Sequence, residues 1–193
     1  MAGESVGGVI YQPFHQYTLN AGEGGKLEAT GRCIWGIQGV GVFGHEKVKR
    51  APGETELAET PRFDAEGSGG NENVICTTRS HSTGVVMDAV NACAPSKVVK
   101  AGGCGYKVLM LMESECHGYV FASPGCKKWD TCAPEALIRE LGGELTDMHG
   151  DRLVYRSGVE RPNRRGVLSA GTKEWHQLYL KRMPQSVLDA ISK

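Results

Sequence analysis

The sequence has no excess of charge of either sign and no long hydrophobic run. Lysine and arginine together number 22, and aspartate and glutamate together also number 22. Because the charges balance, composition excludes the broad electrostatic attraction that is typical of proteins that bind nucleic acid or anionic membranes. The longest apolar stretch, near residues 108–112, is far shorter than the roughly 20 residues that a membrane span needs. We therefore expect no nucleic-acid partner and no membrane partner.

We also expect neither a secretory leader nor a zinc site. Its first residues, Met-Ala-Gly-Glu-Ser-Val-Gly-Gly, contain neither a basic segment nor an apolar run. The seven cysteines include no CxxC pair and no Cys/His spacing typical of zinc sites. An odd number of scattered cysteines favours reduced, mostly buried thiols in a reducing compartment. We expect a cytoplasmic protein in which any anionic ligand is attracted by a local site.

Two patterns of secondary structure follow each other along the chain. Residues 6–11 and 27–37 predict short strands of an antiparallel sheet. Residues 49–73 contain two prolines and a glycine-rich stretch without apolar periodicity, which predicts a long flexible loop. From residue 74 onward, strands alternate with helices, which predicts an α/β layered fold with a largely parallel sheet. The predicted domains are residues 1–48, the remaining part of an N-terminal sheet domain, and residues 74–193, a C-terminal α/β domain.

Within the α/β part, the predicted elements are short and closely spaced. Strands are predicted at 74–78, 97–101, 118–122, near 145, at 153–155 and at 166–170. Helices are predicted from a capping Ser82 to Cys93, at 107–115, 131–141 and 172–182, with another starting near Pro184.

Asp130 follows Trp129 where a loop is expected to enter a helix. A carboxylate at this place can cap the free N–H groups of the first helical turn. It can also point into the crevice outside the strand ends and hold a hard cation through oxygen. Capping is the more common role of such a residue, and the local pattern by itself leaves both roles open.

Two other predicted strand-to-helix junctions carry groups suited to anions. Residues 77–82, Thr-Thr-Arg-Ser-His-Ser, combine hydroxyls and a histidine with free helix N–H groups, although a polar turn with a capping serine explains the same residues. Residues 102–107, Gly-Gly-Cys-Gly-Tyr-Lys, would let the backbone approach a phosphate beside Lys107, or would serve only a tight turn. Lys127 and Lys128 precede Asp130 and form either a solvated face or a further phosphate-binding group.

All of these junctions lie where a predicted strand leads into a predicted helix. In open α/β sheets, ligands bind outside the carboxyl ends of the strands, where the loops lead into helices. Several candidate anion-binding elements and one carboxylate at that edge favour a phosphate ester and a divalent metal as ligands.

The motifs together resemble a known family. Residues 119–135, Tyr-Val-Phe-Ala-Ser-Pro-Gly-Cys-Lys-Lys-Trp-Asp-Thr-Cys-Ala-Pro-Glu, are similar to the second signature of the inositol monophosphatase superfamily. More narrowly, they resemble the 3′(2′),5′-bisphosphate nucleotidases. Residues 77–82 and 102–107 match that subfamily at fitting separations, as do residues 8–13, 35–36 and 145–150.

The resemblance implies a layered α-β-α-β sandwich and a phosphatase that uses Mg²⁺ and is inhibited by Li⁺. Enzymes of this kind remove the 3′-phosphate of adenosine 3′,5′-bisphosphate, or of its sulfated form, to give AMP. The resemblance also implies that Asp130 coordinates metal, that Thr78 and His81 contact the nucleotide, and that Gly103 and Lys107 hold the same ligand.

One part of the family pattern is absent from the sequence. Neither the metal signature Asp-Pro-(Leu/Ile)-Asp-Gly-Thr nor a Glu-Glu pair occurs, and in the family both precede the strand that matches residues 6–11. Mg²⁺ gives up its water reluctantly, so Asp130 alone would bind it weakly, whereas metal-dependent phosphatases need several ligands. We expect an N-terminally truncated fold with no catalytic residue in this chain and no activity by itself. The alternatives are a non-catalytic nucleotide-binding protein and an inositol phosphate phosphatase.

Overall fold

The computed structural model describes residues 3–15, 18–19, 27–28, 31–44, 72–80 and 84–191. Most of the loop predicted at 49–73 lies outside these residues, so the division of the chain into three segments stays a prediction. Within the described residues, no helix is long and apolar enough to cross a membrane.

The first part of the chain forms the predicted antiparallel sheet. Strand β1 (Gly7–Gln12) pairs with β4 (Arg32–Ile37), which pairs in turn with β5 (Gly41–Phe43). A separate two-stranded ladder joins β2 (Thr18–Leu19) to β3 (Leu27–Glu28). We call the sheet of β1, β4 and β5 the small sheet.

The large sheet has five strands in the order β10-β12-β8-β6-β7. Its strands are β6 (Val74–Thr78), β7 (Lys97–Ala101), β8 (Gly118–Phe121), β10 (Glu144–Thr146) and β12 (Val167–Ala170). Strand β6 is parallel to both β7 and β8, whereas β12 is antiparallel to β8 and to β10. The prediction of a largely parallel sheet is therefore wrong for the β10 and β12 side, because a long loop without a crossover helix joins these two strands.

The strand predicted at 153–155 is also wrong. These residues lie in the loop between β10 and β12 and form no strand. Tyr155 instead uses its hydroxyl to contact Glu135 and, at 3.2 Å, Thr131 on the neighbouring helix. A short strand pairing occurs farther along, between β11 (Pro162–Asn163) and β9 (Cys126–Lys127).

Five helices are present in the described residues: α1 (Gly84–Ala92), α2 (Cys104–Met112), α3 (Lys128–Glu140), α4 (Lys173–Arg182) and α5 (Gln185–Ile191). Helices α2 and α3 begin at residues 104 and 128, earlier than the predicted 107 and 131. The prediction placed both starts too late, because the glycines at 102–105 indicate a turn and an aspartate such as Asp130 is typical of the N-cap position. In the structure Gly105 and Asp130 both lie inside the helices.

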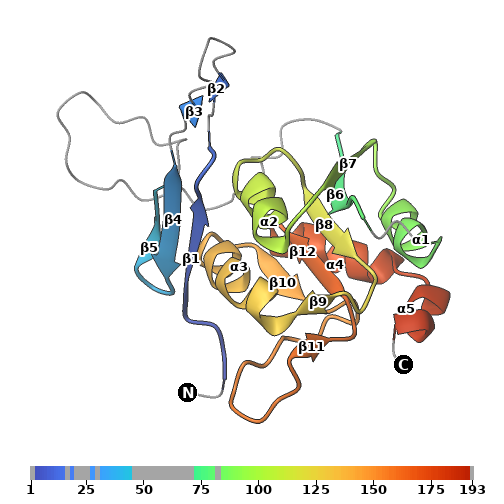
Figure 1. Cartoon of the computed structure of the whole chain (residues 1–193). Coiled ribbons are helices and arrows are strands. Elements are labelled where there is room, and N and C mark those ends of the chain that lie inside the picture. Colours follow the sequence, from blue (N-terminus) through green and yellow to red (C-terminus); the bar gives the residue numbers. More distant parts are fainter. Residues whose placement is uncertain are drawn as a thin grey trace.

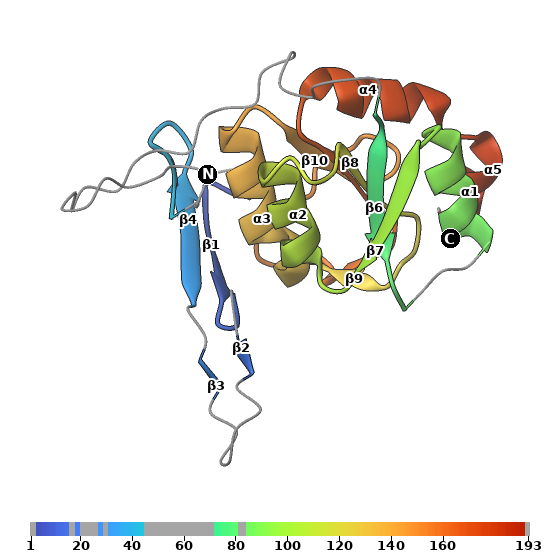
Figure 2. The ribbon, with the colours of Figure 1, turned by 90° about the horizontal axis from the view of Figure 1, so that it is seen from above.

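The layers alternate between sheets and helices, as Figures 1 and 2 show. Helices α2 and α3 lie between the small sheet and the large sheet, and α1, α4 and α5 cover the opposite face of the large sheet. One apolar core joins the small sheet, α2, α3 and the large sheet, and the other joins the large sheet to α1, α4 and α5. The predicted layered α/β sandwich is confirmed.

Close backbone contact holds the small sheet against α3. A Cβ atom at Gly8 would lie 2.5 Å from the carbonyl oxygen of Ala133 on the helix, so glycine is required at this point of the strand. On the same side of the small sheet, Ile34 is fully buried. The opposite side is apolar but exposed: the exposed fractions are 61% for Val9, 63% for Tyr11 and 48% for Ile37.

Two isoleucines of β4 give a matched test of this arrangement. We expect Ile34→Ala to lower the free energy of unfolding by about 2–5 kcal/mol, because it leaves a cavity between β4 and α3. Ile37→Ala removes the same atoms from the exposed side and should cost less than about 1 kcal/mol. Urea unfolding of both variants measures the difference, and equal losses would contradict the described packing.

His176 on α4 is the most strongly enclosed histidine for which a pKa shift is resolved. Its ring is 1% exposed, and its Nε2 lies 2.9 Å from the hydroxyl oxygen of Thr146. Burial lowers the pKa of His176 from 6.5 to about 4, because the charged ring cannot be solvated there.

This pKa shift predicts that the folded chain loses stability as the pH falls. Above pH 6.5 the ring is neutral in both the folded and the unfolded chain, whereas between pH 6.5 and about 4 the unfolded chain binds the proton more readily. The contribution of His176 to stability, about 3 kcal/mol in full, is therefore lost as the pH falls through this window. In urea titrations at pH 7 and pH 4.5, the His176→Gln variant should lose less stability on acidification than the wild type; equal losses would refute the assignment.

Candidate functional site

The parallel strands bring the predicted junctions to one edge of the large sheet. Thr78 ends β6 and pairs in register with Ala101, which ends β7. Strand β8 runs in the same direction and leads through Cys126 into α3. The carboxyl ends of β6, β7 and β8 therefore share the edge at which ligands bind in sheets of this kind. His81 lies outside the described residues.

Thr78 is held at the end of its strand with little freedom. Its side chain is buried, with 6% exposed, and its hydroxyl accepts a hydrogen bond of 3.3 Å from the backbone N–H of Ser80. The preceding residue, Thr77, donates its own hydroxyl to the carbonyl of Val120 at 2.7 Å. This bond ties the end of β6 to β8, so the edge is stiff at the point where the chain leaves the sheet.

Gly103 provides an open stretch of backbone at the start of α2. It is the N-cap residue of that helix, with a φ of 73°, a conformation that side chains with a Cβ rarely adopt. Gly102 and Gly103 are both exposed. Among the described residues, and leaving aside its two neighbours in the chain, only the Cβ of Tyr106 lies within 4 Å of the place where Gly103 would carry a Cβ. An incoming group can thus approach the N-terminal turn of α2, where free N–H groups attract anions.

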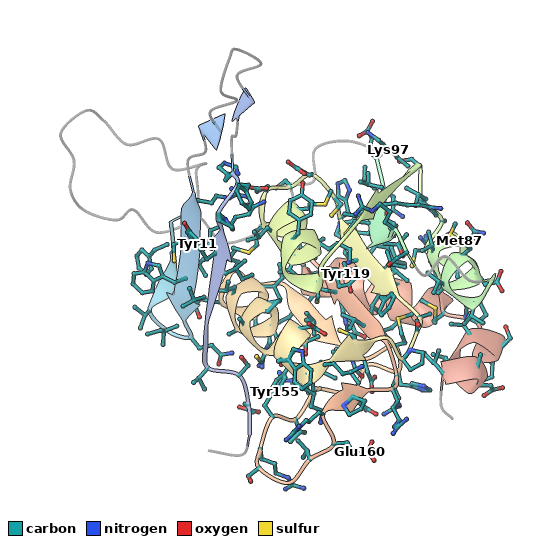
Figure 3. All side chains as sticks on the ribbon, in the orientation of Figure 1. Tyr11, Met87, Lys97, Tyr119, Tyr155 and Glu160 are labelled. Atoms are coloured by element: carbon teal, nitrogen blue, oxygen red, sulfur yellow. The ribbon has the colours of Figure 1, made fainter. Side chains whose placement is uncertain are left out.

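Lys107 lies one turn into α2 and turns back toward this loop. Its Nζ donates a hydrogen bond of 2.8 Å to the carbonyl oxygen of Gly103 and lies 4.8 Å from the ring centre of Tyr119, which stands beside α2 in Figure 3. The side chain is 4% exposed. Burial lowers the pKa of Lys107, and nearby thiols and Asp130 raise it. The ammonium group is therefore fixed beside the glycine loop and close to Asp130.

Asp130 stands inside the first turn of α3, and not at the cap position that the sequence predicted. Its Oδ2 accepts a hydrogen bond of 2.7 Å from the backbone N–H of Lys127, the N-cap residue. The same oxygen lies 3.8 Å from the Sγ of Cys126. The capping role is thus present in the structure, and it holds the carboxylate at the edge that Lys107 also faces.

Lys128 is engaged away from the glycine loop. Its Nζ donates a hydrogen bond of 2.8 Å to the carbonyl of Val154, in the loop between β10 and β12. That loop also forms a pocket of about 320 Å³. Arginine side chains of this pocket pair with carboxylates, as in the 2.9 Å contact of Arg165 with Asp147 and the 3.1 Å contact of Arg164 with Glu160. Because its cations are already paired, the pocket is less suited to an anion than the glycine loop.

The described residues do not by themselves fit Mg²⁺. This ion requires near-octahedral oxygen coordination, usually from more than one carboxylate or substrate oxygen together with water. Among the described residues, no group of three or more His, Cys, Asp or Glu side chains could hold a metal ion. Asp130 can contribute one carboxylate to such a site, and one oxygen of that carboxylate is already used by the helix cap.

The structure also brings residues to this edge that the sequence patterns did not single out. The Nη2 of Arg79 lies 3.7 Å from the point where Gly102 would carry a Cβ, so an exposed cation stands beside the glycine loop. Cys104 at the start of α2 and Cys126 before the start of α3 also lie at this edge, the first partly exposed and the second buried. Arg79 could have been found from its place directly after a predicted strand.

The chain has relatives among known proteins. The chain is 41% identical to 3′(2′),5′-bisphosphate nucleotidase 1 of Homo sapiens over 98% of its own length and 53% of that protein. It is 34% identical to the protein of the same name from Dictyostelium discoideum, over 92% of this chain and 52% of that one. The chain thus spans about half the length of these relatives.

The fold has counterparts among solved structures. Inositol monophosphatase II from Staphylococcus aureus superposes with a TM-score of 0.59 at 11% identity, and the match covers 83% of this chain and 53% of that chain. At such low identity the likeness concerns the fold alone. Residues 1–188 match the sequence profile described as the inositol monophosphatase family. The chain therefore belongs to the inositol monophosphatase family.

Proposed function

We propose that this chain supplies the nucleotide-binding part of a phosphatase acting on nucleoside bisphosphates. The substrate would be adenosine 3′,5′-bisphosphate or its sulfated form, and the product AMP. The main support is the arrangement of Thr78, Gly103, Lys107 and Asp130 at one edge of the parallel strands. The relatives named 3′(2′),5′-bisphosphate nucleotidase point to the same substrate class.

Each proposed contact has a physical basis. The N-terminal turn of α2 offers N–H groups to a phosphate, and Gly103 leaves room for the approach. Lys107 adds a fixed positive charge next to that turn. Thr78 offers a hydroxyl at the adjoining strand end. We assign His81 to the same ligand because it follows Thr78 closely in sequence.

We propose Mg²⁺ as the cofactor of the complete enzyme, with Asp130 as one ligand. Bound Mg²⁺ in phosphatases activates water and neutralises charge on the leaving oxygen. The described residues supply too few ligands for this chemistry, so we assign no catalytic step to them. For this chain by itself we propose the non-catalytic alternative, in which it binds the nucleotide without hydrolysing it. The cytoplasm remains our proposed compartment, since all seven cysteines are free and reducing conditions keep them so.

The binding assignment is tested by removing the charge of Lys107. We expect Lys107→Met to weaken AMP binding about 10–100-fold in isothermal titration calorimetry, because a charge-assisted contact contributes roughly 1.5–3 kcal/mol. Methionine keeps the apolar stem that packs near Tyr119. The matched control is Lys100→Met, which removes an exposed lysine from the adjoining strand β7 and should leave affinity within about 2-fold. Equal effects of the two variants, or preferential binding of inositol monophosphate over AMP, would contradict the assignment.

A second experiment concerns turnover. We expect the chain to release phosphate from adenosine 3′,5′-bisphosphate with Mg²⁺ no faster than a protein-free control, because metal ligands are too few among the described residues. Phosphate release would be measured with and without Mg²⁺. Metal-dependent turnover that is lost in Asp130→Asn would show that the metal site is complete and would overturn the non-catalytic assignment.

A further inference from the structure

The small sheet has two apolar faces, and the described part of the chain covers only one of them. The side chains that point toward the helices include Ile34 and Val42, which are fully buried, and Ile10, which packs against the core. Because side chains alternate along a strand, their neighbours point away from the helices. We call these neighbours the outer face: Val9, Tyr11, Cys33, Trp35, Ile37 and Phe43. None of them is charged.

The outer face runs without a break across the three strands. Tyr11 pairs in register with Cys33, and Trp35 pairs with Val9 on one side and with Phe43 on the other. The rings of Trp35 and Phe43 are stacked, with their centres 4.7 Å apart. In Figures 1 and 2, α2 and α3 lie on one side of the small sheet, and none of the labelled helices lies on the other.

This face is more apolar than the solvated side of an antiparallel sheet usually is. Such a side normally carries polar residues that alternate with the apolar ones of the core. Val9 and Tyr11 are instead more than half exposed, and Phe14 and Val40, which border the sheet, are 60% and 56% exposed. These fractions correspond to roughly 600 Å² of exposed apolar surface. A patch of this size marks an interaction site.

We propose that the outer face is a self-association surface, on which a second copy of this chain packs its own outer face about a two-fold axis. A flat sheet face is complementary to itself, and two sheets stack in this way in β-sandwiches. A specific interface needs about 1,000 Å² of buried surface in total, and two such patches supply roughly 1,200 Å².

The charges of the chain favour a second copy as the occupant. The outer face offers nothing to a partner recognised by charge, because it contains no ionic side chain. The whole chain has 22 basic and 22 acidic residues, so net charge does not keep two copies apart. Because the area is at the low end for specific interfaces, we expect a reversible dimer with a dissociation constant in the micromolar range.

The association does not depend on the proposed function. No residue that we assign to the nucleotide or to the metal belongs to the outer face. Binding of AMP and dimer formation are therefore measured separately, and either can fail without the other.

The dimer is tested by sedimentation equilibrium at chain concentrations from about 1 to 200 μM. We expect a reversible change from the 20.8 kDa of one chain to twice that mass. Val9→Glu would bury a carboxylate between the two copies, so the dissociation constant should rise at least about 10-fold. The matched control is Val154→Glu, which changes an exposed valine in the loop between β10 and β12 and should leave it within about 2-fold.

Circular dichroism spectra show whether these variants fold. Tyr11→Glu changes a second exposed side chain of the outer face, 63% of which is accessible, and should also raise the dissociation constant at least about 10-fold. It keeps the proposal testable if Val9→Glu does not fold.

Cys33 locates the interface without any substitution. It is exposed on the outer face, whereas Cys132 is partly exposed on α3 and lies outside that face. Trypsin places the two cysteines on separate peptides, so mass spectrometry reports the alkylation of each by iodoacetamide. Between the lowest and the highest chain concentration, we expect alkylation of Cys33 to slow at least about 5-fold, while Cys132 reacts at a constant rate.

Three results would overturn the proposal. The first is the mass of a single chain at every concentration; if Cys33 is then also unreactive, another part of the same chain covers the outer face. The second is a wild-type dimer that folded Val9→Glu and Tyr11→Glu leave unchanged, which would place the interface elsewhere. The third is a mass that grows without limit, which would indicate indiscriminate aggregation.

Discussion

The parallel pairing of β6 with both β7 and β8 is the constraint on which the site depends. Because main-chain hydrogen bonds align the three strands in one direction, their carboxyl ends meet at one edge. Helices α2 and α3 then start side by side between the two sheets (Figure 2). Reversing β7 would send Gly103 to the opposite edge, and reversing β8 would send Asp130 there, so either change would separate Gly103 from Asp130.

Lys107 is buried and also lies at this edge of the sheet. Placing an ammonium group among apolar side chains is unfavourable unless polar partners replace water. The carbonyl of Gly103, the ring of Tyr119 and the nearby carboxylate of Asp130 provide that compensation. The interactions that make the burial tolerable also fix the charge beside the glycine loop. Stability and proposed ligand binding therefore depend on the same side chain.

Close backbone packing between the small sheet and α3 determines how these two layers stack. Gly8 lets β1 approach Ala133 more closely than any side chain would allow, and Ile34 fills the space beside it. The salt bridge of Arg32 with Glu113 connects the same sheet to the end of α2. Both intermediate helices are thereby held from two sides, which keeps their N-terminal turns in a constant relation to the large sheet.

The sequence by itself determined the local elements and the chemistry available at their ends. The strands at 74–78 and 97–101 were predicted with the observed limits, because β-branched runs bounded by turn residues are local signals. The residue types of Thr78, Gly103, Lys107 and Asp130 likewise pointed to an anion and a cation. Tertiary structure decided the rest: the antiparallel β10 and β12, the early starts of α2 and α3, and the burial of Lys107. These features depend on which segments pack together, and packing between distant residues leaves no periodic pattern in the chain.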